Sequence, residues 1–214
     1  MKLGIIGGVS PFAFSSFYNC LCEEYRKKTG YYPDILIYSI KVSIAEEQEF
    51  LQNKVSNKTM SSIKSEIKKA CKIFKNNNID TVTICCNTLS SIFCEIAKEY
   101  KFKNIITPVN SVSNYLKNNG RSLLLATGYT NNQMLYKNVL KISEEDQGVI
   151  EDFLREKINF NKSVINIDEI LKKYEYDEIV LACTDINKND LSVKKNVIDS
   201  NECLIKNVLQ IIGD

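Results

Sequence analysis

Short apolar segments alternate with longer amphipathic segments along the chain, and this alternation limits its fold more than any other feature. The apolar segments are rich in isoleucine, leucine and valine, and they are residues 3–6, 35–40, 81–85, 105–106, 123–126, 179–182 and 197–198. Buried parallel strands have this pattern, and the helices between them supply the crossover connections. We therefore predict an α/β protein built on parallel sheets.

The amphipathic segments predict the helices. Ser10-Pro11 is a typical N-cap and first-turn pair, apolar residues follow at helical spacing as far as Tyr25, and Gly30 supplies a stop. Further helical stripes run through residues 60–74, 92–100, 149–158 and 164–173. The segment between residue 40 and residue 60 is a polar stretch.

Two parts of the chain repeat loosely. An aspartate is followed six residues later by a cysteine at the end of a predicted strand, once at Cys86 and once at Cys183. Residues 3–10 and 123–130 also correspond, because in each a strand leads to a glycine and then to a hydroxyl side chain two residues later. The alternative is that any two strand–helix units look alike. Two matches in the same order favour two similar α/β halves that face each other.

The composition excludes several classes of function. The 214 residues contain no histidine, which removes imidazole bases, Ser-His and Cys-His catalysis and His-ligated metal sites. Lys+Arg 28 nearly balances Asp+Glu 26, so no basic surface for nucleic acid is expected. No apolar run is long enough to span a membrane, and the first residues do not resemble a secretory signal. We expect a cytoplasmic protein with neither nucleic-acid nor membrane partners.

Eight cysteines remain as candidates for chemistry. They form no C-x-x-C pair, and a chain of this length and apolar content does not need disulfides, so most should be buried free thiols. Cys86 and Cys183 differ, since polar residues follow each where a strand ends. Ligands of parallel sheets bind at that end, where a helix N-terminus stabilises a thiolate. Strand alternation turns Cys85 to the opposite face, so we predict a structural role for it.

Two thiols across one cleft can racemise a small amino acid without histidine, metal or cofactor. One thiolate removes the Cα proton, and the other thiol donates a proton to the opposite face, which inverts the centre. A thiol pKa can be tuned toward the working pH. The alternative is that Cys86 and Cys183 are buried structural cysteines, but Cys-Asn-Thr and Cys-Thr-Asp are poor continuations of a buried strand.

At these residues the chain resembles the aspartate/glutamate racemases that work without pyridoxal phosphate. The similar motifs follow in order at residues 4–10, 33–39, 86–88, 124–136, 182–185 and 198–200. The resemblance implies two pseudosymmetric α/β domains, each with a short parallel sheet flanked by helices, and an active site in the cleft between them. It also implies a homodimer that acts on a small acidic amino acid and uses no cofactor and no metal.

The resemblance further implies interconversion of L- and D-aspartate, with glutamate as a second substrate, by proton transfer between Cys86 and Cys183. The residues that it implies for substrate binding are Ser10, Asn87, Thr88, Thr127, Thr130 and Thr184. From the residues alone, Ser10 can equally be a helix cap, and the two threonines at 127 and 130 can equally close a turn.

The chain departs from the family pattern at positions that bear on the substrate side chain. Ser90 stands where many members have histidine, and Asp185 stands where many have the longer glutamate. A residue that binds a side-chain carboxylate is hard to locate, and Lys157, Gln48 and Glu49 are weak candidates.

We predict a first half of residues 1–104 plus 200–214, which carries Cys86, and a second half of residues 105–199, which carries Cys183. Two other functions stay open on the same fold. One is a decarboxylase or isomerase of dicarboxylic acids, although related decarboxylases keep only one of the two cysteines. The other is a non-catalytic amino-acid-binding protein. A dinucleotide-binding module is disfavoured, because the first glycines have the spacing G-x-x-G-G rather than G-x-G-x-x-G.

Overall fold

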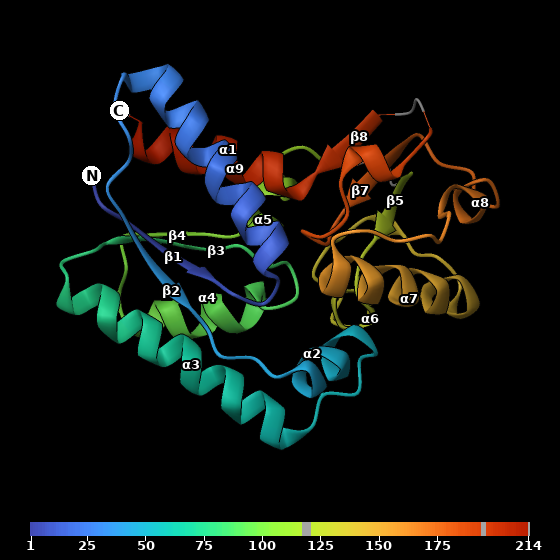
Figure 1. Cartoon of the computed structure of the whole chain (residues 1–214), viewed down its shortest axis with the longest axis horizontal. Helices are drawn as coiled ribbons and strands as arrows, with labels where there is room; N and C mark the ends of the chain where they lie inside the picture. Colours follow the sequence, from blue (N-terminus) through green and yellow to red (C-terminus); the bar gives the residue numbers. More distant parts are fainter. Residues whose placement is uncertain (117–120, 194–195, 214) are drawn as a thin grey trace.

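The structure is a computed structural model that describes residues 1–116, 121–193 and 196–213. Two groups of elements follow each other along the chain (Figure 1). The first group is β1 (Leu3–Gly7), α1 (Pro11–Thr29), β2 (Ile35–Ser39), α2 (Ile44–Leu51), α3 (Asn57–Asn76), β3 (Thr81–Ile84), α4 (Ser90–Glu99), β4 (Asn104–Ile106) and α5 (Pro108–Ser113). The second group is β5 (Ser122–Leu125), α6 (Gly128–Asn132), β6 (Val139–Leu140), α7 (Glu144–Phe160), α8 (Asp168–Leu171), β7 (Glu178–Leu181), the short 3-10 helix Lys188–Asp190, β8 (Asn196–Asp199) and α9 (Ser200–Ile212).

The strands of the described residues form two parallel four-stranded sheets with the same topology. The first sheet has the order β2-β1-β3-β4 and the second has the order β6-β5-β7-β8. Each strand of the first sheet therefore has a counterpart at the same position in the second. Leu3 pairs with Thr81 in the first sheet, and Ser122 pairs with Glu178 in the second. The predicted α/β class with two similar parallel-sheet halves is confirmed.

Helices cover both faces of the first sheet. α3 and α4 lie on one face, where their apolar stripes pack on β1 and β3 through residues such as Ile67, Phe74 and Phe93. α1 and α9 lie side by side on the other face, where Leu3 and Ile5 of β1 contact Phe17 of α1. All six of these side chains are fully buried or nearly so, and the sheet therefore lies between two apolar clusters, one on each face.

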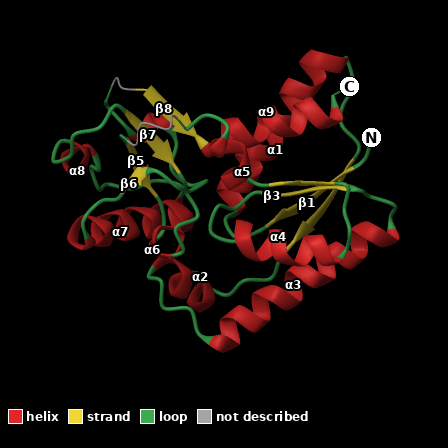
Figure 2. Cartoon of the chain, turned by 180° about the vertical axis from the view of Figure 1, so that it is seen from behind, coloured by secondary structure: helices red, strands yellow, loops and turns green. Residues whose placement is uncertain are grey.

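The second sheet is covered in the same way (Figure 2). α7 and α8 pack on one face, with Phe153 and Leu154 of α7 against Leu125 and Leu181. α5, Tyr136 and the first turn of α9 cover the other face. α9 thus begins on the second sheet and continues along the first, so this helix contacts the cores of both halves.

The turn after β1 explains the glycines in the first motif. Gly8 has φ +98°, which is the left-handed region, and a Cβ there would lie 2.4 Å from Ser39 Oγ. The turn places Ser10 at the N-cap of α1, where its Oγ accepts a hydrogen bond from the Ala13 N–H at 3.4 Å. The helix starts on Pro11, as the sequence predicts.

α2 lies in the segment that the sequence analysis describes only as polar. Its N-terminus has a capping box, in which Ser43 and Glu46 each bind the other's backbone N–H. Although α2 belongs to the first group, it packs on α6 and α7, and Leu51 joins the core of the second half. At Gly128 of α6 a Cβ would lie 2.8 Å from the Leu51 carbonyl oxygen, so glycine permits this close approach. α2 therefore connects the two halves.

Two sequence expectations differ from the structure in extent. The helix predicted at residues 164–173 is limited to α8, because the Glu156 carboxylate accepts hydrogen bonds from Ser163 Oγ and the Val164 N–H and holds the start of that segment outside the helix. The first sheet also extends past residue 104, since Ile106 pairs with Thr83. The proposed domain limits, residues 1–104 with 200–214 and residues 105–199, otherwise stay a prediction.

Candidate active site

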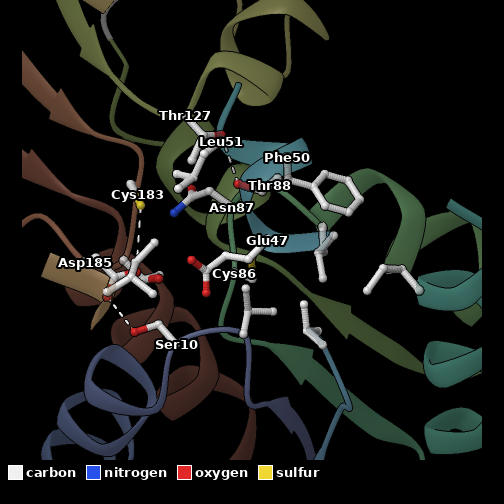
Figure 3. Close-up of a pocket in the computed structure, with 16 residues that line it drawn as sticks. Ser10, Glu47, Phe50, Leu51, Cys86, Asn87, Thr88, Thr127, Cys183 and Asp185 are labelled. Carbon is white, nitrogen blue, oxygen red and sulfur yellow. Dashed lines mark hydrogen bonds between the residues drawn. The ribbon is translucent and has the colours of Figure 1, made fainter. Parts of the chain in front are cut away.

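A pocket lies between the two sheets, at the carboxyl ends of their central strands. Ser10 follows β1, Cys86 follows β3, Thr127 follows β5 and Cys183 follows β7. α2 closes one side of the pocket with Glu47, Phe50 and Leu51, and the close-up shows these side chains around one space (Figure 3). The polar residues that line it are Ser10, Glu47, Cys86, Asn87, Thr88, Thr127, Cys183, Thr184 and Asp185.

Seven of the eight predicted site residues therefore lie around one pocket. The eighth, Thr130, lies directly behind it. Its Oγ1 is 3.3 Å from Thr88 Oγ1 and 3.0 Å from Thr127 Oγ1, and the Thr88 and Thr127 hydroxyls are 3.1 Å apart. This cluster of hydroxyls joins the loop after β3 to the N-cap of α6, so it connects the two halves beside the pocket. The roles of these residues in catalysis and binding stay predictions.

Cys86 ends a buried strand and faces the N-terminus of α4. Burial raises the pKa of its thiol to about 11, while the N–H groups of Leu89 and Thr88 and the Thr88 hydroxyl act in the opposite direction. Ser90, which stands where the family often has histidine, donates its hydroxyl to the Cys86 carbonyl at 2.9 Å. Ser90 thus supports the loop from behind and does not line the pocket.

Cys183 occupies the equivalent position in the second half. Burial raises the pKa of its thiol well above the ordinary value, and the charge of the neighbouring Asp185 carboxyl raises it further. A hydrogen bond from the Asp185 backbone N–H to the sulfur acts in the opposite direction. The Cys183 Sγ lies 4.0 Å from Asp185 Oδ2. Cys86 also raises the pKa of Cys183, which indicates that the two thiols share one electrostatic environment.

Cys85 lies on the other face of the first sheet. It packs in the core between β1, α1 and α9, and its Sγ is 3.9 Å from Asn201 Oδ1. The predicted opposite orientation of Cys85 and Cys86 is confirmed. All eight cysteines, each of them among the described residues, are free thiols.

Asn87 is held by partners from two distant segments. The Tyr136 hydroxyl donates to Asn87 Oδ1, and Asn87 Nδ2 donates to Ser200 Oγ at 3.0 Å. Burial raises the pKa of Tyr136 well above its usual value, so the phenol stays a hydrogen-bond donor. This network fixes the amide at the wall of the pocket and joins it to the first residue of α9.

Ser10 has two contacts, one of which is the helix cap considered from sequence, while its role in substrate binding stays a prediction. Besides capping α1, its Oγ donates to Asp185 Oδ1 at 2.5 Å, which connects the motif at residues 4–10 to the motif at residues 182–185 across the pocket. Asp185 is only 9% exposed. Burial raises the pKa of its carboxyl to about 6, and the Ser10 hydrogen bond and the charge of Lys157 oppose that shift.

Glu47 is the lining residue that the sequence analysis missed. Its carboxylate points into the pocket toward Asp185 (Figure 3). Burial raises its pKa to about 6, and the Asp185 carboxyl adds to the shift. The weak candidates beside it face elsewhere, since Gln48 accepts from Arg155 Nε at 2.8 Å and Glu49 accepts from the Ser56 N–H at 2.7 Å. Helical spacing identifies the residue, because positions 47, 50 and 51 share one face of a helix.

Lys157, the third weak candidate, is buried on α7 but does not line the pocket. Its Nζ lies 2.8 Å from Asp190 Oδ1 in an ion pair. The described residues that line the pocket include no lysine or arginine. Among all described residues, no group of three or more cysteine, aspartate or glutamate side chains is arranged so that it could hold a metal ion. No described helix is long and apolar enough to cross a membrane.

Comparison by sequence finds no protein-family model and no curated protein that matches the chain. Solved structures do match. A Yersinia pestis protein assigned to the Asp/Glu racemases superposes with TM-score 0.76 at 18% identity, over 100% of this chain and 99% of that one. An aspartate racemase homologue from Pyrococcus horikoshii OT3 gives 0.71 at 21% identity, over 100% and 99%. The maleate isomerase of Pseudomonas putida S16 gives 0.62 at 12% identity, over 99% and 92%. The two-sheet α/β fold of this chain is the fold of the Asp/Glu racemases.

Proposed function

We propose that this protein is a cofactor-independent racemase that interconverts the enantiomers of an α-amino acid by proton transfer between Cys86 and Cys183. One observation carries the proposal: two thiols at equivalent strand ends of two similar halves line a single pocket. That arrangement supplies an acid and a base from opposite sides, as inversion of a carbon centre requires.

The proposed step moves two protons and consumes nothing else. The thiolate of one cysteine takes the Cα proton, which leaves a carbanion conjugated with the α-carboxylate. The thiol of the other cysteine then gives its proton to the opposite face of that carbon. The product has the inverted configuration, and the two cysteines have exchanged protonation states. The reverse reaction uses the same groups with their roles exchanged.

The other polar residues suit the two ends of an amino acid. Asn87, Thr88, Thr127 and Thr184 offer amide and hydroxyl donors for the α-carboxylate, as the sequence analysis expects. Asp185, beside Cys183, offers an acceptor for the α-ammonium group. Since charge develops at the α-carboxylate during proton removal, donors fixed around it stabilise the transition state most.

The sequence resemblance implies aspartate as the substrate and glutamate as a second one. The decisive assay follows the loss of the Cα–H signal of each enantiomer of aspartate and glutamate by NMR in deuterated water, without added cofactor. A broader set of amino acids belongs in the same assay. Exchange at Cα together with appearance of the other enantiomer on a chiral column supports a racemase. If no amino acid exchanges, or if activity is lost on dialysis against a chelator and restored by metal, the proposal fails.

We also propose, on the resemblance, that the protein is a homodimer with a small-molecule substrate, and, on the composition, that it is cytoplasmic with neither nucleic-acid nor membrane partners. Sedimentation velocity at micromolar concentration measures the oligomeric state directly. A single species with the mass of one 24.4 kDa chain would contradict the dimer.

A further inference from the structure

The charges that line the pocket are unusual for a site that takes an acidic amino acid. Two carboxyl groups, Glu47 and Asp185, face the same space, and the described lining residues supply no cationic side chain. A substrate with a carboxylate on its side chain would bring a second negative charge toward Glu47. In a pocket that excludes water, such a like-charge contact is strongly unfavourable.

Asp185 is positioned to bind the α-ammonium group. Its Oδ2 is 4.0 Å from the Cys183 Sγ, and its Oδ1 is fixed by the Ser10 hydroxyl at 2.5 Å. A carboxylate next to a thiol that exchanges protons with Cα lies near the atoms bonded to Cα, and the ammonium group is one of these. An α-amino acid has one ammonium group at Cα, so the Asp185 carboxylate is sufficient to pair with it and a second carboxylate is not required there.

Glu47 is then left without a partner from the amino-acid backbone. It lies about half-buried, and its neighbours on the pocket wall include the apolar side chains of Val42, Phe50, Leu51 and Ile63. Within the described residues its one hydrogen-bond donor is the Gln48 amide, at the long distance of 3.5 Å. A carboxyl group among apolar side chains with one weak contact is suited to a cation from outside.

The nearest buried lysine does not provide this cation. Lys157 forms its ion pair with Asp190 at 2.8 Å, and both side chains are largely buried. The charge of Lys157 lowers the pKa of the Asp185 carboxyl, whereas it does not contribute to the pKa shift of Glu47. The apolar wall and the acidic group beyond it together suit an aliphatic side chain that ends in an ammonium or guanidinium group.

We propose that Glu47 determines the specificity of the pocket, and that the amino acid bound there carries a cationic group at the end of an aliphatic side chain. This proposal rests on the proposed function in that it takes the ligand to be an α-amino acid. It departs from the aspartate implied by the sequence resemblance. The class includes lysine, ornithine and arginine, and the length of the side chain is decided by the experiment.

The test compares amino acids that differ in side-chain charge. Cα–H exchange in deuterated water is measured for both enantiomers of lysine, ornithine, arginine, norleucine, glutamine, aspartate and glutamate. We expect kcat/KM for at least one cationic amino acid to exceed that for norleucine by about 30-fold or more, as for a buried charge pair. Titration calorimetry of the same compounds measures binding independently of turnover.

The variants Glu47→Gln and Glu46→Gln provide the matched pair. Both replace a carboxylate with an amide on α2. Glu46 faces Ser43 at the helix start, outside the pocket, and glutamine keeps the capping box. We expect Glu47→Gln to raise KM for the cationic amino acid by about 30-fold or more and to leave exchange of norleucine nearly unchanged. Glu46→Gln should behave as the wild type with every compound.

The outcomes separate this proposal from the proposed function. Exchange of aspartate or glutamate with no exchange and no binding of cationic amino acids overturns the cationic ligand and leaves the racemase standing. Equal loss of exchange with cationic and neutral amino acids in Glu47→Gln also overturns the specificity role. Binding of cationic amino acids that depends on Glu47, without exchange of any Cα–H, refutes the racemase and supports the assignment of the pocket.

Discussion

The two cysteines of the pocket are chemically the same group in two different surroundings. Cys86 accepts from two backbone N–H groups and from the Thr88 hydroxyl at the start of α4, whereas Cys183 accepts from the Asp185 N–H. These donors lower the pKa of each thiol, and the Asp185 carboxyl raises the pKa of both. The similar motifs Cys-Asn-Thr and Cys-Thr-Asp do not reveal this difference in hydrogen-bond donors.

The first prediction concerns these thiols. Cys86→Ser and Cys183→Ser should each lower racemisation by about 10²–10⁴-fold, because a hydroxyl has too high a pKa to replace the thiol as a base. Each variant should keep slow Cα–H exchange with only one enantiomer, the one whose proton faces the remaining cysteine. Cys85→Ser is the matched control, since its side chain lies on the other face of the sheet. Near-normal turnover of both enantiomers in either site variant would contradict the two-base mechanism.

The second prediction concerns pH and the Asp185 carboxyl. Its pKa is raised from 3.8 to about 6 in the folded protein, so the folded state binds this proton more tightly than the unfolded state does. The associated stability is present below pH 3.8 and is lost as the pH rises through 6. Asp185→Asn, which keeps an acceptor for Ser10, should therefore raise the free energy of unfolding by about 3 kcal/mol above pH 6.

Urea unfolding of wild type and Asp185→Asn between about pH 3 and pH 8 measures that gain. The gain should shrink as the pH falls below 6 and approach zero below pH 3.8, where the wild-type carboxyl is protonated in both states. A difference that is the same at every pH would show that the ionisation of Asp185 is not its cause.

At the scale of elements, strands with buried apolar runs could be predicted from sequence and short amphipathic elements could not. Four of the missed elements are α2, α5, α6 and β6, of eight, six, five and two residues. Each is too short for periodicity to identify, and tertiary contacts stabilise it instead. The capping box at Ser43 and Glu46 is the local signal that predicts α2.

The missed α2 explains the missed site residue. Without a helix at 44–51, positions 47, 48 and 49 have no defined directions, so the sequence analysis names Gln48 and Glu49 as weak candidates. Once the helix is known, its apolar residues Phe50 and Leu51 mark the pocket side and place Glu47 there. By contrast, Cys86 and Cys183 follow fully buried apolar strands, whose ends the sequence locates well.

The third prediction concerns the contact between α2 and α6. Gly128→Ala places a methyl group 2.8 Å from the Leu51 carbonyl oxygen and 2.5 Å from Glu151 Oε1, and the backbone oxygen cannot rotate away as the end of a flexible side chain can. We expect a loss of about 1–3 kcal/mol in the free energy of unfolding, as for other overpacked sites. Gly148→Ala is the control, since a Cβ there has no neighbour within 4 Å. Equal stability of the two variants, measured by urea unfolding, would contradict the contact.

At the scale of the whole molecule, two elements join the halves. α2 carries Leu51 into the second core, and α9 contributes Cys203 to the second sheet and Leu204 and Val208 to the first. Both contacts are buried, so separating the halves exposes apolar surface on each of them. The halves should therefore unfold together.

The fourth prediction tests this coupling. Leu204→Ala removes a fully buried side chain and should lower the free energy of unfolding by about 2–5 kcal/mol. Hydrogen exchange followed by mass spectrometry should show the same loss of protection in the most protected peptides of β1 and of β7, because both depend on α9. If peptides of β7 keep wild-type protection while those of β1 lose it, the halves unfold independently.

The path of α9 also affects how the protein is made. Leu204 belongs to the same buried cluster as Ile5, which precedes it by about 200 residues. At about 5–20 residues per second, a ribosome adds that stretch in about 10–40 s. During this time the strands and α1 of the first half emerge while the second half is synthesised, and the part of one apolar face that α9 covers stays exposed. The core around the first residues to be translated is thus the last to be completed. Nascent chains of this protein should therefore depend on chaperones that shield the exposed apolar surface until α9 leaves the ribosome.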